Sequence, residues 1–463
     1  MKDLLRVDMK TNHLVEGSIA RSIFLMAFPL LIRAMLQSFQ AVIDMFWVGK
    51  LGSVSIAAVA MGGTVIMAMV PILFGISTGT LVLISRSIGS RNYAKANDVA
   101  AQSLVTAFIA SVIFVIIGIS FSKTILQLLQ AQGEVLALGD VYLRILLFGG
   151  VTMTVLFIGG AILQGAGDAI TPMVIMVIVT FLNIILDPVL IFGLLGLPKM
   201  GVSGAAWATV IAQAIGSVFM LFVIMQGKSH VHVPFEKIRI DLKIIWHILK
   251  IGVPSSIQMF FRNLMNMVLL SIVAGFGTYA IAAYGIGMRL RMFILMPSFA
   301  IGQATAAIVG QNLGANKERR AVTCAHVASM VNVIMMIFFG AVFFIFPEKI
   351  MSLFNKNPMV IEEGNRLLKI TAPFFPFVAL GVVFGRVLQG AGETIAPMVI
   401  TIATLWGMQI PLAIILAKYL AWGATGIWWA IAVSSVVNGL ITLMWFNAGH
   451  WKKKKMPGMQ NNK

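Results

Sequence analysis

The chain has 463 residues, of which 59% are hydrophobic and 11% charged, and its mean hydropathy is +0.96. These values exclude a soluble globular domain, in which about 45–50% of the residues are apolar and about 25% are charged. The formal net charge of +18 does not indicate nucleic-acid binding, because the basic residues lie between apolar segments instead of on one compact domain. A single cysteine, Cys324, excludes an internal disulfide.

Apolar runs long enough to cross a bilayer, about 20 residues each, occur twelve times along the chain. We therefore predict an all-α polytopic membrane protein with twelve transmembrane helices and both termini on one side. The predicted spans are 19–48, 54–80, 96–120, 138–162, 171–195, 203–226, 244–274, 279–308, 321–346, 364–388, 395–418 and 424–447.

The loops on the two sides of these spans differ in positive charge. The termini and the loops on their side carry 21 Lys and Arg residues, and the opposite loops carry 8. By the positive-inside rule, both termini are predicted to be cytoplasmic in a cell (inner or plasma) membrane. The basic run 452–455 is expected to face anionic lipid.

The two halves of the chain repeat each other at a constant offset of 225 residues, which carries Pro29 onto Pro254. The same offset carries LQGAGD at 163–168 onto LQGAGE at 388–393. Each half has six spans, so the repeat is parallel, and we expect two six-helix bundles around a central cleft. The predicted domains are an N-terminal lobe with a cytoplasmic N-terminus (1–228), a cytoplasmic linker (229–243) and a C-terminal lobe with a basic cytoplasmic tail (244–463).

The first span carries a polar stripe on one helix face, at positions i, i+4, i+7 and i+11: Arg33, Gln37, Gln40 and Asp44. A charge at the bilayer centre costs at least roughly 2.5–3.5 kcal/mol, so a carboxylate at this depth usually has a function. At the repeat offset Asp44 falls on Leu269, which confines this acid to the N-terminal half.

A second acid, Asp187, lies in the fifth span, with Thr180 and Asn183 on the same helix face. Pro188 follows directly, and because it cannot donate a backbone hydrogen bond it should free the carbonyl of Ile184. Carboxylate, amide and carbonyl oxygens are the ligands that a hard cation prefers. The residues of the fifth span therefore favour a cation-binding site in the N-terminal half.

The sequence resembles the MATE (multidrug and toxic compound extrusion) family, and looks closest to its prokaryotic DinF-like branch. The resemblance rests on Pro29, VIDMFWVGKLG at the end of the first span, LQGAGD with its copy LQGAGE, NIILDP at 183–188, GVSGAAWAT at 201–209 and the full-length repeat. It implies a transporter, not an enzyme, that exports drugs or organic cations against H⁺ or Na⁺ and needs no other cofactor. The chain departs from the NorM-like branch, which carries acids in its C-terminal lobe.

By this resemblance, the cation- or proton-coupling cluster consists of Asp44, Asn183, Asp187 and Thr209, and if Na⁺ is the coupling ion the first three would bind it. Hinges are expected at Pro29 and Pro188. The residues expected to line the substrate cleft are Gln37, Gln40, Tyr142, Met176 and Arg262. The expected partners are small-molecule drugs or organic cations and the lipid bilayer, and the chain is expected to be a monomer.

Alternatives remain open at this point. Asp44 could be the structural partner of a buried arginine, and Asp187 could cap a helix end before Pro188. A second function, a flippase for a lipid or a lipid-linked oligosaccharide in the same wider superfamily, would need a basic cleft for a diphosphate. Four arginines are available for such a cleft: Arg33, Arg262, Arg289 and Arg291.

Overall fold

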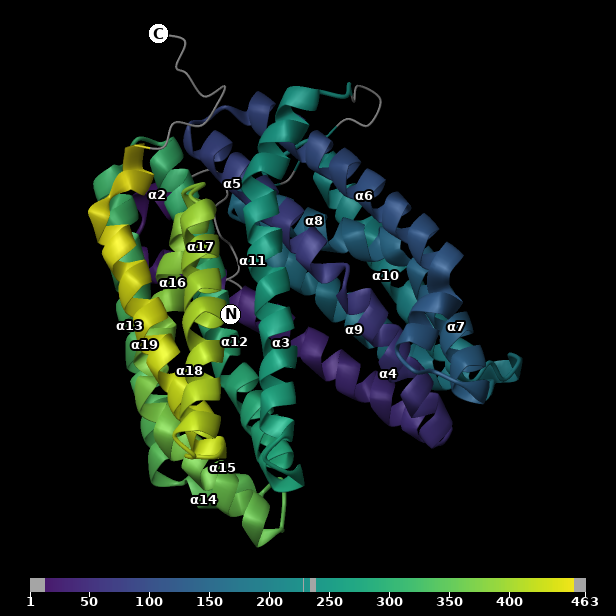
Figure 1. Ribbon diagram of the computed structural model, residues 1–463. Helices are drawn as coiled ribbons and strands as arrows, with labels where there is room; N and C mark the ends of the chain where they lie inside the picture. Colours follow the sequence, from purple (N-terminus) through teal and green to yellow (C-terminus); the bar gives the residue numbers. More distant parts are fainter. Residues whose placement is uncertain (1–12, 228, 234–238, 454–463) are drawn as a thin grey trace. The chain divides into compact units, whose positions relative to one another are not determined.

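A computed structural model describes residues 13–227, 229–233 and 239–453 of the chain, and within these ranges it contains helices and no strand (Figure 1). Several of the Lys and Arg residues that were counted for the positive-inside rule lie outside the described residues, including Lys2, Lys237 and Lys454. Residues 234–238 of the expected linker also lie outside them.

Two compact units divide the chain, one containing residues 28–253 and the other containing residues 13–27 together with the residues from Pro254 on. The first break falls inside helix α3 (Ile19–Gly49), one residue before Pro29, and the second falls inside α11 (Leu242–Ala274), directly before Pro254. These prolines correspond at the repeat offset. The N-terminal end of α3 therefore belongs to the second unit, and the N-terminal end of the equivalent helix α11 belongs to the first.

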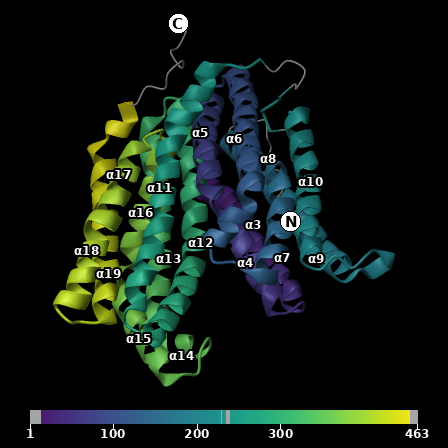
Figure 2. The same cartoon turned by 45° about the vertical axis from the view of Figure 1, so that its right-hand side comes forward.

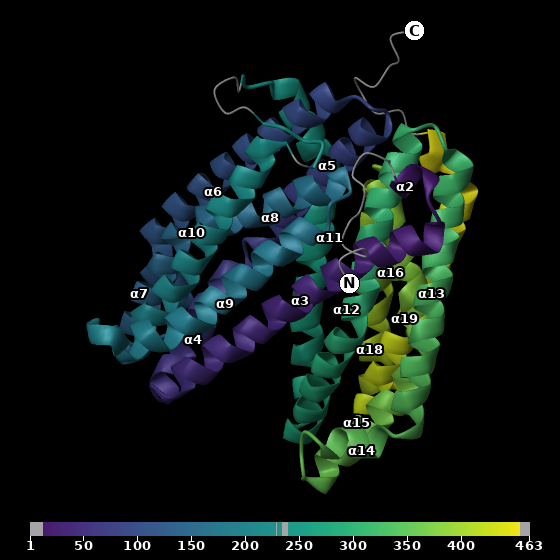
Figure 3. The same cartoon turned by 180° about the vertical axis from the view of Figure 1, so that it is seen from behind.

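The first unit is formed by the first half of the chain (purple to teal in Figure 1), and its helices α9 and α10 run side by side (Figure 3). One part of its core gathers around Val48, Ile191 and Ala205, so that α3, α9 and α10 share it. Besides α3, the helices are α4 (Ser53–Met67), α5 (Val70–Gly89), α6 (Tyr93–Leu128), α7 (Gly133–Phe148), α8 (Gly150–Ala166), α9 (Ile170–Phe192), the 3₁₀ turn η1 (Leu194–Gly196) and α10 (Val202–Gln226).

The second unit is formed mainly by the second half of the chain (green to yellow), with α16 in contact with α12, α13 and α19 (Figure 2). Its core includes Trp428, which is fully buried. Besides α11, the elements are α2 (His13–Glu16), α12 (Thr278–Gly314), α13 (Glu318–Ile345), α14 (Pro347–Ser352), α15 (Pro358–Thr371), η3 (Ala372–Phe374), α16 (Phe375–Gly390), α17 (Ile395–Thr404), the π-helical η4 (Leu405–Gln409), α18 (Ile410–Ile414), the π-helical η5 (Ile415–Tyr419), α19 (Ala424–Ala448) and η6 (His450–Lys453).

Within the described residues, eleven helices are long and apolar enough to cross a membrane, and the bent pair α7 and α8 makes a twelfth span. The pair bends by 46° at Gly149. Helix α6 exposes large apolar side chains such as Phe108, Ile113 and Phe121, which is the arrangement a lipid-facing helix requires. The chain is a multi-pass membrane protein with the predicted number of spans, although the fourth begins at Gly133, before the predicted residue 138.

Equivalent helix pairs in the two units pack closely at equivalent glycines. A Cβ atom added to Gly204 of α10 would lie 2.6 Å from the backbone carbonyl carbon of Leu190 in α9. In the second unit, a Cβ atom added to Gly426 of α19 would lie 2.6 Å from the corresponding carbon of Leu416. Small residues allow such backbone-to-backbone packing between membrane helices. The two units therefore use the same packing for equivalent helix pairs.

The paired LQGAGD and LQGAGE sequences end one helix and begin the next. Gly167 and Gly392 adopt left-handed backbone angles, with φ of 97° and 84°. Asp168 then accepts hydrogen bonds from the backbone N–H groups of Ile170 and Thr171 at 3.1 and 2.9 Å, and so caps α9. These two turns therefore end one helix and start the next.

Candidate cation-coupling site

Four polar side chains from α3, α9 and α10 meet inside the first unit. The carboxyl groups of Asp44 and Asp187 lie within hydrogen-bonding reach of each other. The Nδ2 atom of Asn183 donates to Oδ1 of Asp187 at 3.4 Å and to Oγ1 of Thr209 at 3.5 Å. The structure thus brings together the four residues that the sequence suggested for the coupling cluster.

Several oxygens of this cluster, and one of Thr180 on the same face of α9, are buried without a donor. Asp187 and Asn183 are 0% exposed, and Thr180 is 3% exposed. Four of the oxygens have no hydrogen-bond partner among the described residues: Oδ1 of Asp44, Oδ2 of Asp187, Oδ1 of Asn183 and Oγ1 of Thr180. Leaving buried polar atoms unpaired costs about 1–3 kcal/mol each. A proton or an alkali cation would satisfy the acceptors among these atoms, because it supplies the positive partner that they lack.

Local sequence explains why these side chains converge. Thr180, Asn183 and Asp187 recur at the helical period on α9, and Pro188 inside this helix removes the N–H group that Ile184 would otherwise bond. Two hydrogen bonds then hold the α10 side close: the N–H of Met200 donates to the carbonyl of Leu190, and that of Gly201 to Ile191, both at 3.1 Å. With Gly204 beside Leu190, Thr209 comes to lie opposite Asn183.

The two structural alternatives for the acids find no support. No Lys or Arg among the described residues forms an ion pair with Asp44 or Asp187. Asp187 is not a helix cap, because α9 continues for five residues beyond it to Phe192. Two carboxylates this close, and desolvated, strongly disfavour both being charged at once. The pair is therefore suited to bind one positive charge.

The residues predicted for the substrate cleft take different positions. Tyr142 interacts electrostatically with both Asp44 and Asp187, so it belongs to the neighbourhood of the acids. Gln40 is buried, Gln37 is exposed and Met176 is half-buried on α9. Arg262 belongs to the second unit and lines a cavity there.

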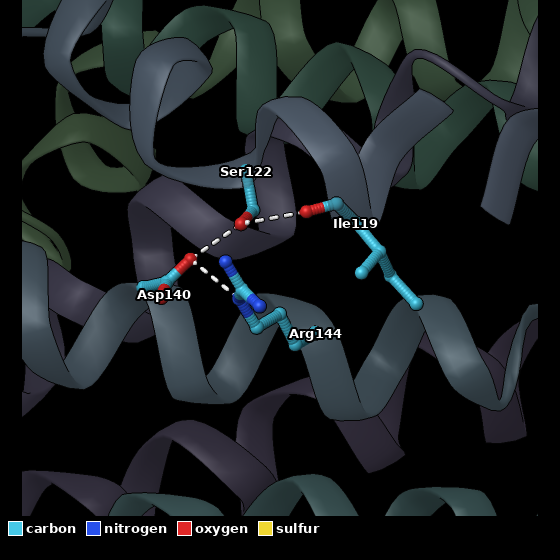
Figure 4. A network of polar contacts seen from close by, with 4 residues as sticks. All are labelled: Ile119, Ser122, Asp140 and Arg144. Carbon is cyan, nitrogen blue, oxygen red and sulfur yellow. Dashed lines mark hydrogen bonds and ion pairs between the residues drawn. The ribbon is translucent and has the colours of Figure 1, made fainter. Parts of the chain in front are cut away.

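The sequence reading missed a third buried acid of the first unit, Asp140, because the predicted span began only two residues before it. Asp140 is 7% exposed and lies in the middle of α7. Its Oδ1 accepts hydrogen bonds from Oγ of Ser122 at 2.5 Å and from Nε of Arg144 at 3.0 Å (Figure 4). The i, i+4 spacing of Asp140 and Arg144 was the available signal. Unlike the Asp44–Asp187 pair, this acid has its positive partner in place.

Comparison with known proteins assigns the family. The MatE family model matches residues 29–189 and 254–415, one block in each half, and the blocks begin at the two equivalent prolines. The chain belongs to the MatE family. MatE relatives include the probable multidrug resistance protein YoeA of Bacillus subtilis, 29% identical over 452 residues, which cover 96% of this chain and 97% of YoeA. The multidrug export protein MepA of Staphylococcus aureus is 26% identical over 440 residues, covering 94% of this chain and 95% of MepA.

Solved structures show the same MatE fold. One is the outward-facing conformation of a multidrug resistance MATE family transporter, with a TM-score of 0.88, 26% identity and coverage of 96% of this chain and 98% of that chain. Another is a MOP superfamily transporter from Pyrococcus furiosus, described as having a binding pocket of reverse polarity that suggests a different function. Its TM-score is 0.87 at 26% identity, with coverage of 96% of this chain and 98% of that chain.

Proposed function

We propose that this MatE chain is a secondary active exporter that exchanges organic cations or lipophilic drugs for H⁺ or Na⁺ by alternating access. Family membership and the printed functions of the relatives support the export of drugs. The observation that carries the coupling mechanism is the buried Asp44–Asp187 pair, whose carboxylate oxygens include two without any partner in the described chain. The proposed exporter is a monomer in the cell membrane with both termini in the cytoplasm.

In this mechanism the coupling cation and the organic cation compete for the same negative charge. When the pair is deprotonated and free of Na⁺, it attracts an organic cation into the first unit. Entry of H⁺ or Na⁺ neutralises the pair, and the attraction for the organic cation is lost. Asn183 keeps Asp187 oriented through its hydrogen bond, and the Thr209 hydroxyl in turn accepts a hydrogen bond from Asn183.

Pro29 is the proposed hinge for this exchange. It lies in α3, next to the point where this helix passes from one unit to the other, and Asp44 lies about four turns further along the same helix. Because a proline weakens the backbone ladder locally, α3 can bend there at low cost. Such a bend moves Asp44 relative to Asp187, and so links protonation of the pair to the shape of the unit. Pro188 gives α9 a similar freedom beside Asp187.

The free energy available for export depends on how much net charge crosses the membrane in each transport cycle. Exchange of one H⁺ for one monovalent organic cation moves no net charge, so the membrane potential contributes nothing, and each pH unit supplies about 1.4 kcal/mol, or a tenfold gradient. If two cations enter for each one that leaves, one net charge moves inward, and about 2.3 kcal/mol is added for every 100 mV.

The test is efflux of a fluorescent organic cation from proteoliposomes after a jump in pH or in Na⁺ concentration. Wild-type protein is expected to respond to one of the two jumps, and Asp44→Asn and Asp187→Asn are expected to lose that response. Asp140→Asn is the matched control, because Asp140 is also a buried acid of this unit but bonds Arg144. If the first two variants respond like wild type, the coupling assignment is wrong. If no organic cation moves while a lipid-linked substrate does, the flippase alternative replaces export.

A further inference from the structure

A cavity of about 170 Å³ lies within the second unit, and its charged wall is purely basic. The lining includes Arg262 of α11 and Arg291 of α12, and no Asp or Glu. A cavity of about 150 Å³ can hold a benzene molecule in another protein. The cavity therefore has room for the polar head and the first carbons of an amphiphile.

The arginines of this cavity lack a counter-charge. Arg262 and Arg291 are close enough to repel each other. Neither Arg262 nor Arg291 forms an ion pair with a described residue. Both side chains are half-buried, and two neighbouring positive charges that are partly removed from water are costly unless an anion joins them. An anionic ligand would supply the missing partner.

Tyr284 provides an independent observation at the same cavity. It is 4% exposed, and its buried hydroxyl has no hydrogen-bond partner among the described residues. The ring stacks on Trp428, with centroids 5.8 Å apart and planes inclined by 11°. Tyr284 lies two turns before Arg291 on α12 and interacts with it electrostatically. A ligand oxygen bound to Arg291 could therefore also accept the Tyr284 hydroxyl proton in a hydrogen bond.

The remainder of the wall is largely apolar and adaptable, and includes Met265, Leu269, Met288, Met292, Leu295 and Phe299. Thioether side chains adjust to ligands of varied shape. The π-helical turn η4 contributes its first and last residues, Leu405 and Gln409, to the lining. Such turns are rare and often occur at functional sites.

The repeat shows that the two halves carry different charges at equivalent positions. Arg262 occupies the position of Gln37, Arg291 that of Ile66, and Leu269 that of Asp44. The position of the acid Asp44 in the first unit is thus occupied by a neutral leucine in the second. Two other positions that are neutral in the first unit carry arginines in the second. The chemistry of the second unit cannot be inferred from that of the first.

We propose that the cavity of the second unit binds an amphiphilic organic anion. Its carboxylate or phosphate head is held by Arg262, Arg291 and the Tyr284 hydroxyl, and its apolar body lies against the methionine-rich wall. Guanidinium groups match the oxygens of both heads in a bidentate manner. The arginines would repel an organic cation, so this site is separate from the cation-coupling cluster and does not depend on the proposed exchange mechanism.

The test is binding of tritiated palmitate to the purified full-length protein on scintillation beads, with empty micelles subtracted. Unlabelled palmitate and lysophosphatidic acid are expected to compete, which shows an oxyanion site. Competition by only one of the two identifies whether the head is a carboxylate or a lipid phosphate. Methyl palmitate and an organic cation are expected not to compete. Equal competition by methyl palmitate would overturn the proposal, because it would show apolar partitioning without a charge requirement.

Variants locate the site. Arg262→Gln and Arg291→Gln are expected to weaken palmitate binding about tenfold to a hundredfold, the range for loss of a charge-assisted hydrogen bond. Arg289→Gln is the matched control, because Arg289 is exposed on the same helix and does not line the cavity. Wild-type affinity in both lining variants would contradict the proposal.

Thermal unfolding without ligand separates binding from a structural role. Arg291→Gln is expected to unfold at or above the wild-type temperature, because mutual repulsion is relieved, whereas a structural arginine would leave a less stable protein. If either glutamine variant fails to fold, Tyr284→Phe decides the question. It keeps the stacking on Trp428 and removes only the hydroxyl, so binding should weaken several-fold. Unchanged palmitate affinity in Tyr284→Phe would then refute the site.

Discussion

Replacement of Gly204 by Ala tests whether the packing of α9 against α10 positions the coupling cluster. The new Cβ atom would lie 2.6 Å from the backbone of Leu190, whereas ordinary contacts begin at 3.4 Å, so the two helices must separate by about 0.8 Å. A backbone atom cannot rotate away as a side chain can. Overpacking of this kind costs about 1–3 kcal/mol. The Asn183–Thr209 hydrogen bond, already 3.5 Å long, should break at the same time.

The matched control is Gly426→Ala, which meets the backbone of Leu416 at the same 2.6 Å but lies in the second unit. Both variants should unfold at a lower temperature than wild type in detergent, because both force a helix pair apart. Only Gly204→Ala should also weaken the response of dye efflux to the pH or Na⁺ jump. If the two variants lose that response equally, or if Gly204→Ala keeps it in full, the reasoning that this contact positions the cluster is refuted.

Three further substitutions test other parts of the account. Asp168→Ala removes the cap of α9 and the 2.6 Å hydrogen bond from Ser229, so the free energy of unfolding should fall by about 1 kcal/mol in a thermal unfolding experiment. An unchanged unfolding temperature would show that Asp168 does not stabilise the helix as a cap. Asp140→Asn should cost about 1 kcal/mol or less, because Arg144 is 45% exposed and can be solvated, and a lost efflux response would show that this acid also takes part in coupling. Thr209→Val should shift the Na⁺ or pH midpoint of efflux by less than about tenfold, since it removes only the weak hydrogen bond from Asn183 and the hydroxyl's bond to the carbonyl of Ala205 within its own helix. A complete loss of coupling would mean that Thr209 binds the cation directly.

The sequence was sufficient for the spans, the repeat and the cluster on α9. Membrane helices must satisfy their backbone internally, so length and hydropathy alone reveal them. The period of 3.6 residues places Asn183 and Asp187 on one face without knowledge of the fold. That Asp44 from a distant helix reaches Asp187 followed in the sequence reading only from the family resemblance.

Other features depend on tertiary contacts that no local pattern contains. Residues 13–27, which precede Pro29, belong to the second unit, and the residues directly before Pro254 belong to the first. This assignment depends on the tertiary contacts of these helix ends. The burial of Asp140 depends on where α7 begins and on the bend at Gly149. The basic cavity of the second unit depends on the rotation of α12, which turns Arg291 toward the cavity and leaves Arg289 exposed although they are two residues apart.

In the proposed mechanism, H⁺ or Na⁺ and an organic cation compete for the Asp44–Asp187 pair. This competition is tested most directly by the dissociation constant of a fluorescent organic cation for the purified protein, titrated against pH and separately against Na⁺. The affinity for the organic cation is expected to fall as the concentration of the coupling cation rises, by up to tenfold for each tenfold increase when one cation is displaced. Asp187→Asn is expected to remove this dependence, whereas Asp140→Asn is expected to keep it. A dissociation constant that changes with neither cation, or an unchanged dependence in Asp187→Asn, would contradict this mechanism.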